Sequence, residues 1–257
     1  MIIVALRTRT LLAAGGAVLV SVAVTGCGAD AGDAKAEHKS FALSGKTLTV
    51  DSDNSQIELV PADVKDVEVT RRVDGWVFMG TGPEAKWSMK DGTLTLRVKC
   101  DAVASSCAAR HEIRVPRGVA VTVRDGNGGV TATGFSTPLK VSSGNGRVTV
   151  RNSSGALDLD SDNGKVEGEG ISAKSVVAGS HNGGVRLTLT SVPDRVETSS
   201  NNGAVEVTLP KQAGLTYKVS TKSHNGDVNV SVPRSDTSAH VVRATSDNGE
   251  VTVRSAN

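Results

Sequence analysis

The chain has 257 residues, with 29 basic and 27 acidic side chains and only 2% aromatic residues. The first 26 residues contain Arg7 and Arg9 and no acidic residue, so the remainder is formally neutral, with 27 charges of each sign. A neutral chain lacks the basic excess that binds phosphate backbones, so we expect no nucleic-acid partner.

Residues 1–26 have the order of a lipoprotein signal peptide. Arg7 and Arg9 form a positive start, Leu11 to Val24 is uncharged and mostly apolar, and small residues lead to Gly26-Cys27. A Cys directly after the small residues of such a leader is the acceptor for lipid. We predict that Cys27 tethers the chain to membrane lipid on the extracytoplasmic face of the cell membrane. Two alternatives stay open, an ordinary secretory peptide that ends in Cys and an uncleaved membrane helix.

Residues 27–40, which begin at the lipidated Cys, are small, polar and charged, and predict a flexible tether. Residues 41–257 are expected to form one domain. A degenerate copy of a repeat surrounds Asn54, with Ser52 before it and Ile57 and Leu59 after it.

Residues 61–115 break the repeat and predict an irregular β cap or insert. Asp74-Gly75 and Asp91-Gly92 have the composition of hairpin turns. Short strands are expected at residues 67–70, 93–96 and 113–115. Such a segment would cover the open end of a stack of strands.

This segment also contains two cysteines and three of the few aromatic residues. Outside the cell a pair of thiols usually oxidises, so Cys100 and Cys107 are expected to form a disulfide; two unpaired cysteines are the alternative. Trp76, Phe78 and Trp87 are a candidate ligand patch, and packing within the cap is the competing interpretation.

From residue 116 to residue 257 the unit Ser-x-Asn-Gly-x-Val-x-Val recurs. Its Asn residues are Asn127, Asn145, Asn163, Asn182, Asn202, Asn225 and Asn248, at spacings of 18, 18, 19, 20, 23 and 23. Apolar residues alternate with polar ones on both sides of each Asn-Gly, which predicts two strands per unit joined by a corner. Gly after Asn permits a positive φ at that corner.

A unit of this length cannot bury its apolar face alone but can stack on its neighbours. We therefore predict an all-β fold, a single-stranded parallel β-helix or β-solenoid of about seven to eight rungs with one disulfide in its cap. Stacking would align the Asn residues into a buried structural ladder, with Asn248 in the last rung. Asn-Gly is also a hairpin signal, so an irregular antiparallel sandwich is the alternative.

Three stretches together carry a family resemblance. The Cys100 to Cys107 segment, Val115-Pro116-Arg117-Gly118 with the strand that follows, and the Asn-Gly copies resemble the bacterial "putative adhesin" family of β-strand-repeat proteins of unknown function. The resemblance covers most of residues 41–257. It implies a β-solenoid at the cell envelope and transfers no catalytic residue.

Motifs for chemistry are incomplete, and we expect no metal and no cofactor. His111-Glu112 begins a zinc-protease pattern, but Val115 stands where the second His is needed. Asp158, Asp160 and Asp162 imitate part of a calcium loop, although alternation turns them outward as a solvated strand face. Stacking would place His181 beside Asp162 and His224 beside Asp247.

The expected function is a non-enzymatic structural, binding or adhesion role at the cell envelope, with a cell-wall or surface glycan or a protein as partner. One alternative is a carbohydrate-active β-helix enzyme, which would need clustered carboxylates in a groove. The other is an accessory sensor of envelope stress.

Overall fold

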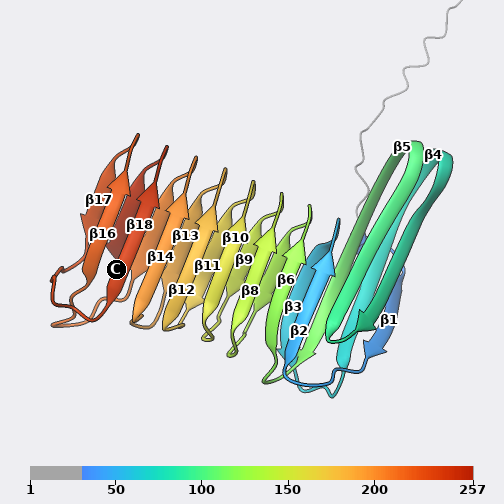
Figure 1. The fold of residues 1–257 in the computed structure, drawn as a ribbon, viewed down its shortest axis with the longest axis horizontal. Helices are drawn as coiled ribbons and strands as arrows, with labels where there is room; N and C mark the ends of the chain where they lie inside the picture. Colours follow the sequence, from blue (N-terminus) through green and yellow to red (C-terminus); the bar gives the residue numbers. More distant parts are fainter. Residues whose placement is uncertain (1–30, 257) are drawn as a thin grey trace, which may run out of the picture.

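The computed structural model describes residues 31–256, which form one helical turn, η1 (Ala31–Asp33), and a single sheet of 19 strands that is folded into two walls (Figure 1). The strands are β1 (Ala36–Phe41), β2 (Thr47–Ser52), β3 (Gln56–Ala62), β4 (Val67–Lys90), β5 (Thr93–Pro116), β6 (Ala120–Asp125), β7 (Val130–Thr133), β8 (Leu139–Ser143), β9 (Val148–Arg151), β10 (Leu157–Ser161), β11 (Val166–Ile171), β12 (Ser175–Ser180), β13 (Val185–Leu189), β14 (Arg195–Ser200), β15 (Val205–Leu209), β16 (Lys218–Ser223), β17 (Val228–Ser231), β18 (Val241–Ser246) and β19 (Val251–Ser255). Because η1 has three residues, no helix of the described chain is long enough to cross a membrane.

Each repeat supplies one strand to each wall, and like strands pair in parallel from one repeat to the next. For example, β10 lies between β8 and β12, with Leu157 opposite Leu139 and Val176. The pairs β2–β3, β6–β7, β8–β9, β10–β11, β12–β13, β14–β15, β18–β19 and β16–β17 make eight rungs. The predicted parallel β-solenoid is thus confirmed, and the antiparallel sandwich is excluded.

Period-two alternation builds the core because every second side chain points between the two walls. The inward residues are buried in all rungs but one, as in Leu139, Val141 and Val148. The exception is β16–β17, where Val228 is 43% exposed and Val219 is half-buried. A terminal rung has this pattern because nothing stacks on its outer side.

The last two repeats are exchanged in space, which corrects the predicted rung order. Strand β18 pairs with both β14 and β16, so the final repeat lies inside and the Asn225 repeat forms the end of the stack. The inner repeat has the more apolar inward set, with Ala244 where the outer one has Thr221. The spacing of 23 residues on either side of Asn225 accommodates the longer crossover, which is fixed by a hydrogen bond of 2.9 Å from the Tyr217 hydroxyl to the Pro210 carbonyl.

The predicted irregular cap is a long antiparallel ribbon made by β4 and β5. Asp91 and Gly92, with φ values of 48° and 71°, form its turn, as predicted. Asp74-Gly75 is not a turn, which corrects the prediction. Gly75 pairs with Cys107 inside the ribbon, and a Cβ on Gly75 would lie 2.6 Å from the Ser106 carbonyl oxygen. This glycine therefore serves close approach of the two strands rather than a turn.

The ribbon bends into an arch that stands beyond the corners of the rungs (Figure 1). The first residues of β5 pair in parallel with β2 up to Leu96, and its last residues pair with β3 from Arg110 onward. Between these legs β5 pairs with β4 alone among the described strands. We call residues 73–86 of β4 and 97–109 of β5 the arch.

The end of the stack next to the arch is closed by further strands. The first leg of β4 pairs with β1, with Phe41 opposite Val67. The predicted flexible tether, residues 27–40, is therefore wrong over part of its length, because η1 and most of β1 lie within it. The ordering of β1 follows from its pairing with β4 and from burial of Phe41.

Candidate functional site

The cysteines that were predicted to carry modifications fall in two regions. Cys27 lies outside the described residues. Cys100 and Cys107 form the predicted disulfide, which joins the two legs of β5 within the arch. The bridge sits beside the first corner of the solenoid, since Cys100 and Cys107 line the same small cavity as Asn54 and Asn127. It holds the base of the arch closed.

The apex of the arch exposes apolar side chains. Trp76 is 54% exposed, Phe78 is 59% exposed and Met79 is 74% exposed. They are three of the six large hydrophobic side chains that are exposed in the described chain, and they lie within four residues. We call Trp76, Phe78 and Met79 the apex cluster. Contiguous exposed apolar groups usually mark a surface that another molecule covers.

Trp87 does not belong to this cluster, which divides the predicted ligand patch. It lies in β4 just beyond the arch, opposite Leu96, and packs edge-on against Phe41 at 6.0 Å between ring centroids. The Arg71 guanidinium covers its ring at 4.1 Å. Trp87 therefore closes the core, whereas Trp76 and Phe78 face outward.

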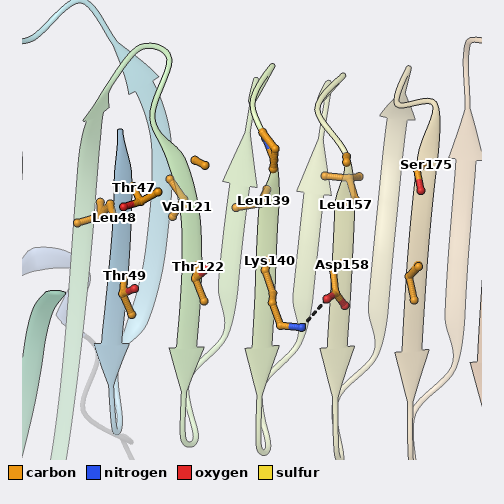
Figure 2. A pocket seen from close by; sticks show the side chains of 14 residues that line it. Thr47, Leu48, Thr49, Val121, Thr122, Leu139, Lys140, Leu157, Asp158 and Ser175 are labelled. Carbon is orange, nitrogen blue, oxygen red and sulfur yellow. Dashed lines mark hydrogen bonds and ion pairs between the residues drawn. The ribbon is translucent and has the colours of Figure 1, made fainter. Parts of the chain in front are cut away.

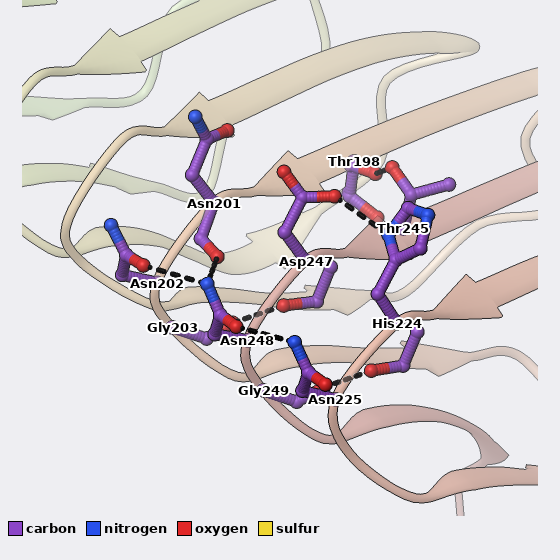
Figure 3. Close-up of polar contacts among 12 residues, drawn as sticks. Thr198, Asn201, Asn202, Gly203, His224, Asn225, Thr245, Asp247, Asn248 and Gly249 are labelled. Atoms are coloured by element: carbon purple, nitrogen blue, oxygen red, sulfur yellow. Dashed lines mark hydrogen bonds and ion pairs between the residues drawn. The ribbon is translucent and has the colours of Figure 1, made fainter.

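The seven predicted Asn residues form a ladder on one edge of the solenoid, but the ladder is exposed and not buried. Each side-chain amide donates to the Asn oxygen of the neighbouring rung, as in Asn182 to Asn163 at 2.7 Å and Asn202 to Asn182 at 2.8 Å. Asn54 begins the row by accepting from Asn127. Figure 3 shows the far end, where Asn248 lies between Asn202 and Asn225. The prediction that Asn248 lies in the last rung is therefore wrong.

A second ladder, made of Ser side chains, is buried directly behind the first, in line with the expectation that stacking aligns Ser with Ser. Ser180 donates to the Gly164 carbonyl at 2.9 Å and accepts from the Gly183 amide at 2.8 Å. The same contacts to the preceding rung are made by Ser143, Ser161, Ser200, Ser246 and Ser223. The sequence signal was present, because a Ser stands two places before almost every Asn of the repeat.

Asp125 replaces Ser in one rung of this buried ladder. Its carboxylate accepts from the Gly128 amide, but burial raises the pKa of Asp125, and hydrogen bonding to backbone amides opposes this only in part. A raised pKa means that folding favours the protonated form. The contribution of Asp125 to the free energy of unfolding is therefore fully present below the pKa of this group in the unfolded chain. It is lost as pH rises through the pKa of the group in the folded chain.

Asp125→Ser is expected to stabilise the protein at pH 7, because it removes a buried carboxylate and restores the hydroxyl of the other rungs. We expect a gain of about 1 kcal/mol at pH 7 and little difference at about pH 2, where the carboxyl is protonated in both the folded and the unfolded chain. Urea unfolding of both proteins at the two pH values measures it. A variant whose stability relative to the parent is lower at pH 7 than at about pH 2 would contradict the sign.

A shallow groove of about 400 Å³ crosses the outward face of one wall (Figure 2). It runs over β2, β6, β8, β10 and β12 and is lined by small hydroxyl and apolar side chains, among them Thr49, Thr122 and Val177. Five strands at about 4.8 Å give it a length of roughly 19 Å. Lys140 and Asp158 form an ion pair on its floor.

The outward charges on the other wall are paired from rung to rung. Glu206 accepts from Arg186 at 2.8 Å and from Arg254 at 2.6 Å. Such pairs between adjacent strands stabilise the wall. Glu167 lies 3.6 Å from Arg147 of the preceding rung and accepts from Lys165 of its own rung at 2.6 Å, and the contact with Lys165 lowers the pKa of Glu167. Glu167 is therefore held ionised and is a poor proton donor.

The three aspartates and the histidines that were considered as ligands are placed by the repeat. Asp158 and Asp160 point outward on β10, and burial raises the pKa of Asp160, with Asp162 and Asp158 adding to the effect. His224 lies 2.9 Å from Asp247, as stacking predicts, and both are exposed at the corner in Figure 3. His181 stacks on Asp162, as predicted, because Ser180 pairs with Ser161 and the Asn182 backbone amide donates to the Asp162 carbonyl. The His181 ring lies 2.9 Å from the Asn201 side-chain amide.

His111 occupies an inward position and is 1% exposed. Burial, with a smaller effect of Arg71, lowers the pKa of His111 to about 4, so the ring is neutral at physiological pH. Among the side chains that the structure describes, no group of three or more His, Cys, Asp or Glu is arranged to hold a metal ion.

Comparisons with known proteins identify a family. The family model described as Toastrack DUF4097 matches residues 29–256. No curated protein matches the chain. A solved "putative adhesin" from Parabacteroides distasonis is 12% identical with a TM-score of 0.49, over 86% of this chain and 98% of that one. A "putative adhesin" from Bacteroides fragilis is 13% identical with a TM-score of 0.47, over 86% and 97% of the two chains. A "putative cell adhesion protein" from Clostridium sporogenes is 12% identical with a TM-score of 0.37, over 86% and 99%.

Proposed function

Because the chain belongs to the Toastrack DUF4097 family, whose model spans residues 29–256, we propose that it is a lipid-anchored, extracytoplasmic module that binds at the cell envelope without catalysing a reaction. The anchoring part of this proposal rests on the leader that ends in Gly26-Cys27. Two or three acyl chains on one Cys would hold the chain firmly on a bilayer, since each buried methylene contributes about 0.8 kcal/mol.

The observation that carries the binding role is the groove on the outward wall. Its floor is a flat sheet with the hydroxyls of Thr47, Thr49 and Thr122, and it is open along the stack. Such a surface can contact an extended, hydroxyl-rich polymer over several rungs, whereas it does not enclose a small substrate. Its ionisable groups, Lys140 and Asp158, are paired with each other. We therefore propose a cell-wall or surface glycan as the partner.

Cys27→Ser is expected to abolish lipidation and to release the chain from the membrane fraction. Metabolic labelling with a fatty-acid analogue, followed by fractionation of the cells, measures both effects. The parent should carry label and sediment with membranes, and the variant should do neither. Label that persists on the variant would refute the assignment of Cys27.

The released variant also tests the binding half of the proposal. Co-sedimentation of the Cys27→Ser chain with purified insoluble cell-wall glycan is expected, and Thr122→Glu in the groove should weaken it. The matched control is Thr131→Glu, at a half-buried outward position on the opposite wall. Equal binding by both variants would place the contact elsewhere, and no binding by any of them would refute the glycan proposal.

A further inference from the structure

We propose that the apex of the arch inserts into the surface of the bilayer that holds the lipid anchor, so that Trp76, Phe78 and Met79 lie in the membrane interface. The inference rests on the proposed anchoring at Cys27. In this proposal the apex cluster contacts the membrane rather than a soluble ligand, and the end of the solenoid that carries the arch faces the membrane.

The arch reaches beyond the corners of the neighbouring rungs, and the described chain begins beside it, since η1 contacts β4 and β5. In Figure 1 the ribbon of β4 and β5 rises past the corner of the neighbouring rungs. The stretch of β5 between Leu96 and Arg110 contacts no other rung through strand pairing. The apex is therefore free to meet a surface before the rungs do.

The start of the described chain is fixed to the arch itself. Helix η1 contacts β4 and β5, and Ala31 is 4% exposed. Ala31 and Gly32 line one cavity together with Cys107 and Ala108. Cys107 pairs with Gly75, the residue before Trp76. The start of the described chain thus lies beside the base of the apex cluster.

The length of chain between that point and the anchor is short. Four peptide steps join Cys27 to Ala31, and fully extended they span at most about 14 Å. A lipid on Cys27 therefore keeps the bilayer surface within this distance of Ala31. The apex, which projects from the same place, comes within reach of the interface without any change in the fold.

The chemistry of the apex cluster matches a bilayer interface. Trp and Phe favour the headgroup boundary, where the ring is apolar and the indole N–H finds a polar partner. Met79 has a φ of 52°, in a region that large side chains rarely adopt, and 74% of it is exposed. This backbone conformation is strained, and such strain is expected where an exposed apolar side chain has a function. The disulfide between Cys100 and Cys107 makes the tip rigid enough to insert.

Trp76 and Trp87 are the only two Trp residues of the chain, so fluorescence can test the proposal. The lipidated parent and its Trp76→Phe variant are reconstituted into phosphatidylcholine vesicles, with and without bromine on the acyl chains. Bromine quenches only a ring that it touches. We expect loss of emission and a blue shift for the parent, and no bromine-dependent loss for Trp76→Phe, whose remaining Trp87 lies between Arg71 and Phe41.

Flotation of the same vesicles separates the two proposals. A purified parent chain that does not float with vesicles would refute the anchoring and, with it, the insertion of the apex. A parent that floats, but whose Trp76 is unquenched by bromine and open to aqueous acrylamide, would overturn the insertion alone and return the apex to a soluble ligand. Equal quenching of parent and Trp76→Phe would overturn it as well.

Discussion

Gly146→Ala is expected to destabilise the solenoid by about 3 kcal/mol or more. A Cβ at this position would lie 1.7 Å from the carbonyl oxygen of Gly128, which is backbone and cannot move aside without shifting the neighbouring rung. The contact exists because the corners stack at the spacing of the strands. This close approach, and not the predicted positive φ, explains the glycine, since the Gly of each Asn-Gly pair in the repeat lacks a positive φ. Urea unfolding of the purified variant and parent measures the loss.

The matched control is Gly129→Ala, which adds the same methyl group in a neighbouring corner. Its nearest atom would be the Arg147 carbonyl oxygen at 3.5 Å, an ordinary contact, so we expect a change below about 1 kcal/mol. Equal and small effects of the two substitutions would mean that the corners do not stack as closely as described.

Ser180→Ala is expected to cost about 2–4 kcal/mol, because the change leaves a partly buried carbonyl and a partly buried amide without their partner. The Ser180 hydroxyl bridges Gly164 and Gly183 at 2.9 and 2.8 Å, and the residue is 5% exposed. Thermal and urea unfolding of the variant give the cost.

Asn182→Ala supplies the comparison, two residues away in the same corner. Its side chain also links two rungs, but it is exposed, so water can replace both hydrogen bonds. We expect a loss of about 1 kcal/mol. A loss at Asn182 as large as that at Ser180 would show that the outer ladder, and not the buried one, holds the corners together.

The repeat made most of the fold predictable. Alternation on either side of Asn-Gly identifies the inward positions, and Leu139, Val148 and Val176 are buried where it places them. Stacking then follows because such a unit has no other way to cover its apolar face. The order of the final two repeats was not predictable, since both have the same pattern and the same spacing of 23 residues from the preceding Asn. Their inward residues differ mainly in Thr221 of one repeat against Ala244 of the other.

The arch was predictable only in part, because one sequence signal serves two structures. Asp91-Gly92 and Asp74-Gly75 both satisfy the pattern of a turn. Only the first has the positive φ values that the pattern implies, whereas Gly75 makes room for Cys107. Likewise, three aromatic residues in one segment do not reveal that the bend of the ribbon places Trp87 against the core and Trp76 at the apex.

The ladders show a limit of reasoning from residue type. Asn was expected to be buried because its amide can both donate and accept, and the structure does link Asn163, Asn182 and Asn202 in this way. The smaller Ser hydroxyl fits behind the corner, where the backbone groups of two adjacent rungs converge, and so takes the buried place.

The orientation of the arch on the bilayer is tested most directly by hydrogen exchange. The lipidated chain on phosphatidylcholine vesicles is compared with the Cys27→Ser chain in solution. We predict slower exchange in peptides that cover residues 73–82 at the apex and no change in peptides that cover β16 and β17 at the far end of the stack. Unchanged exchange at the apex, or slower exchange in β16 and β17, would contradict the proposal that the arch holds the solenoid to the membrane.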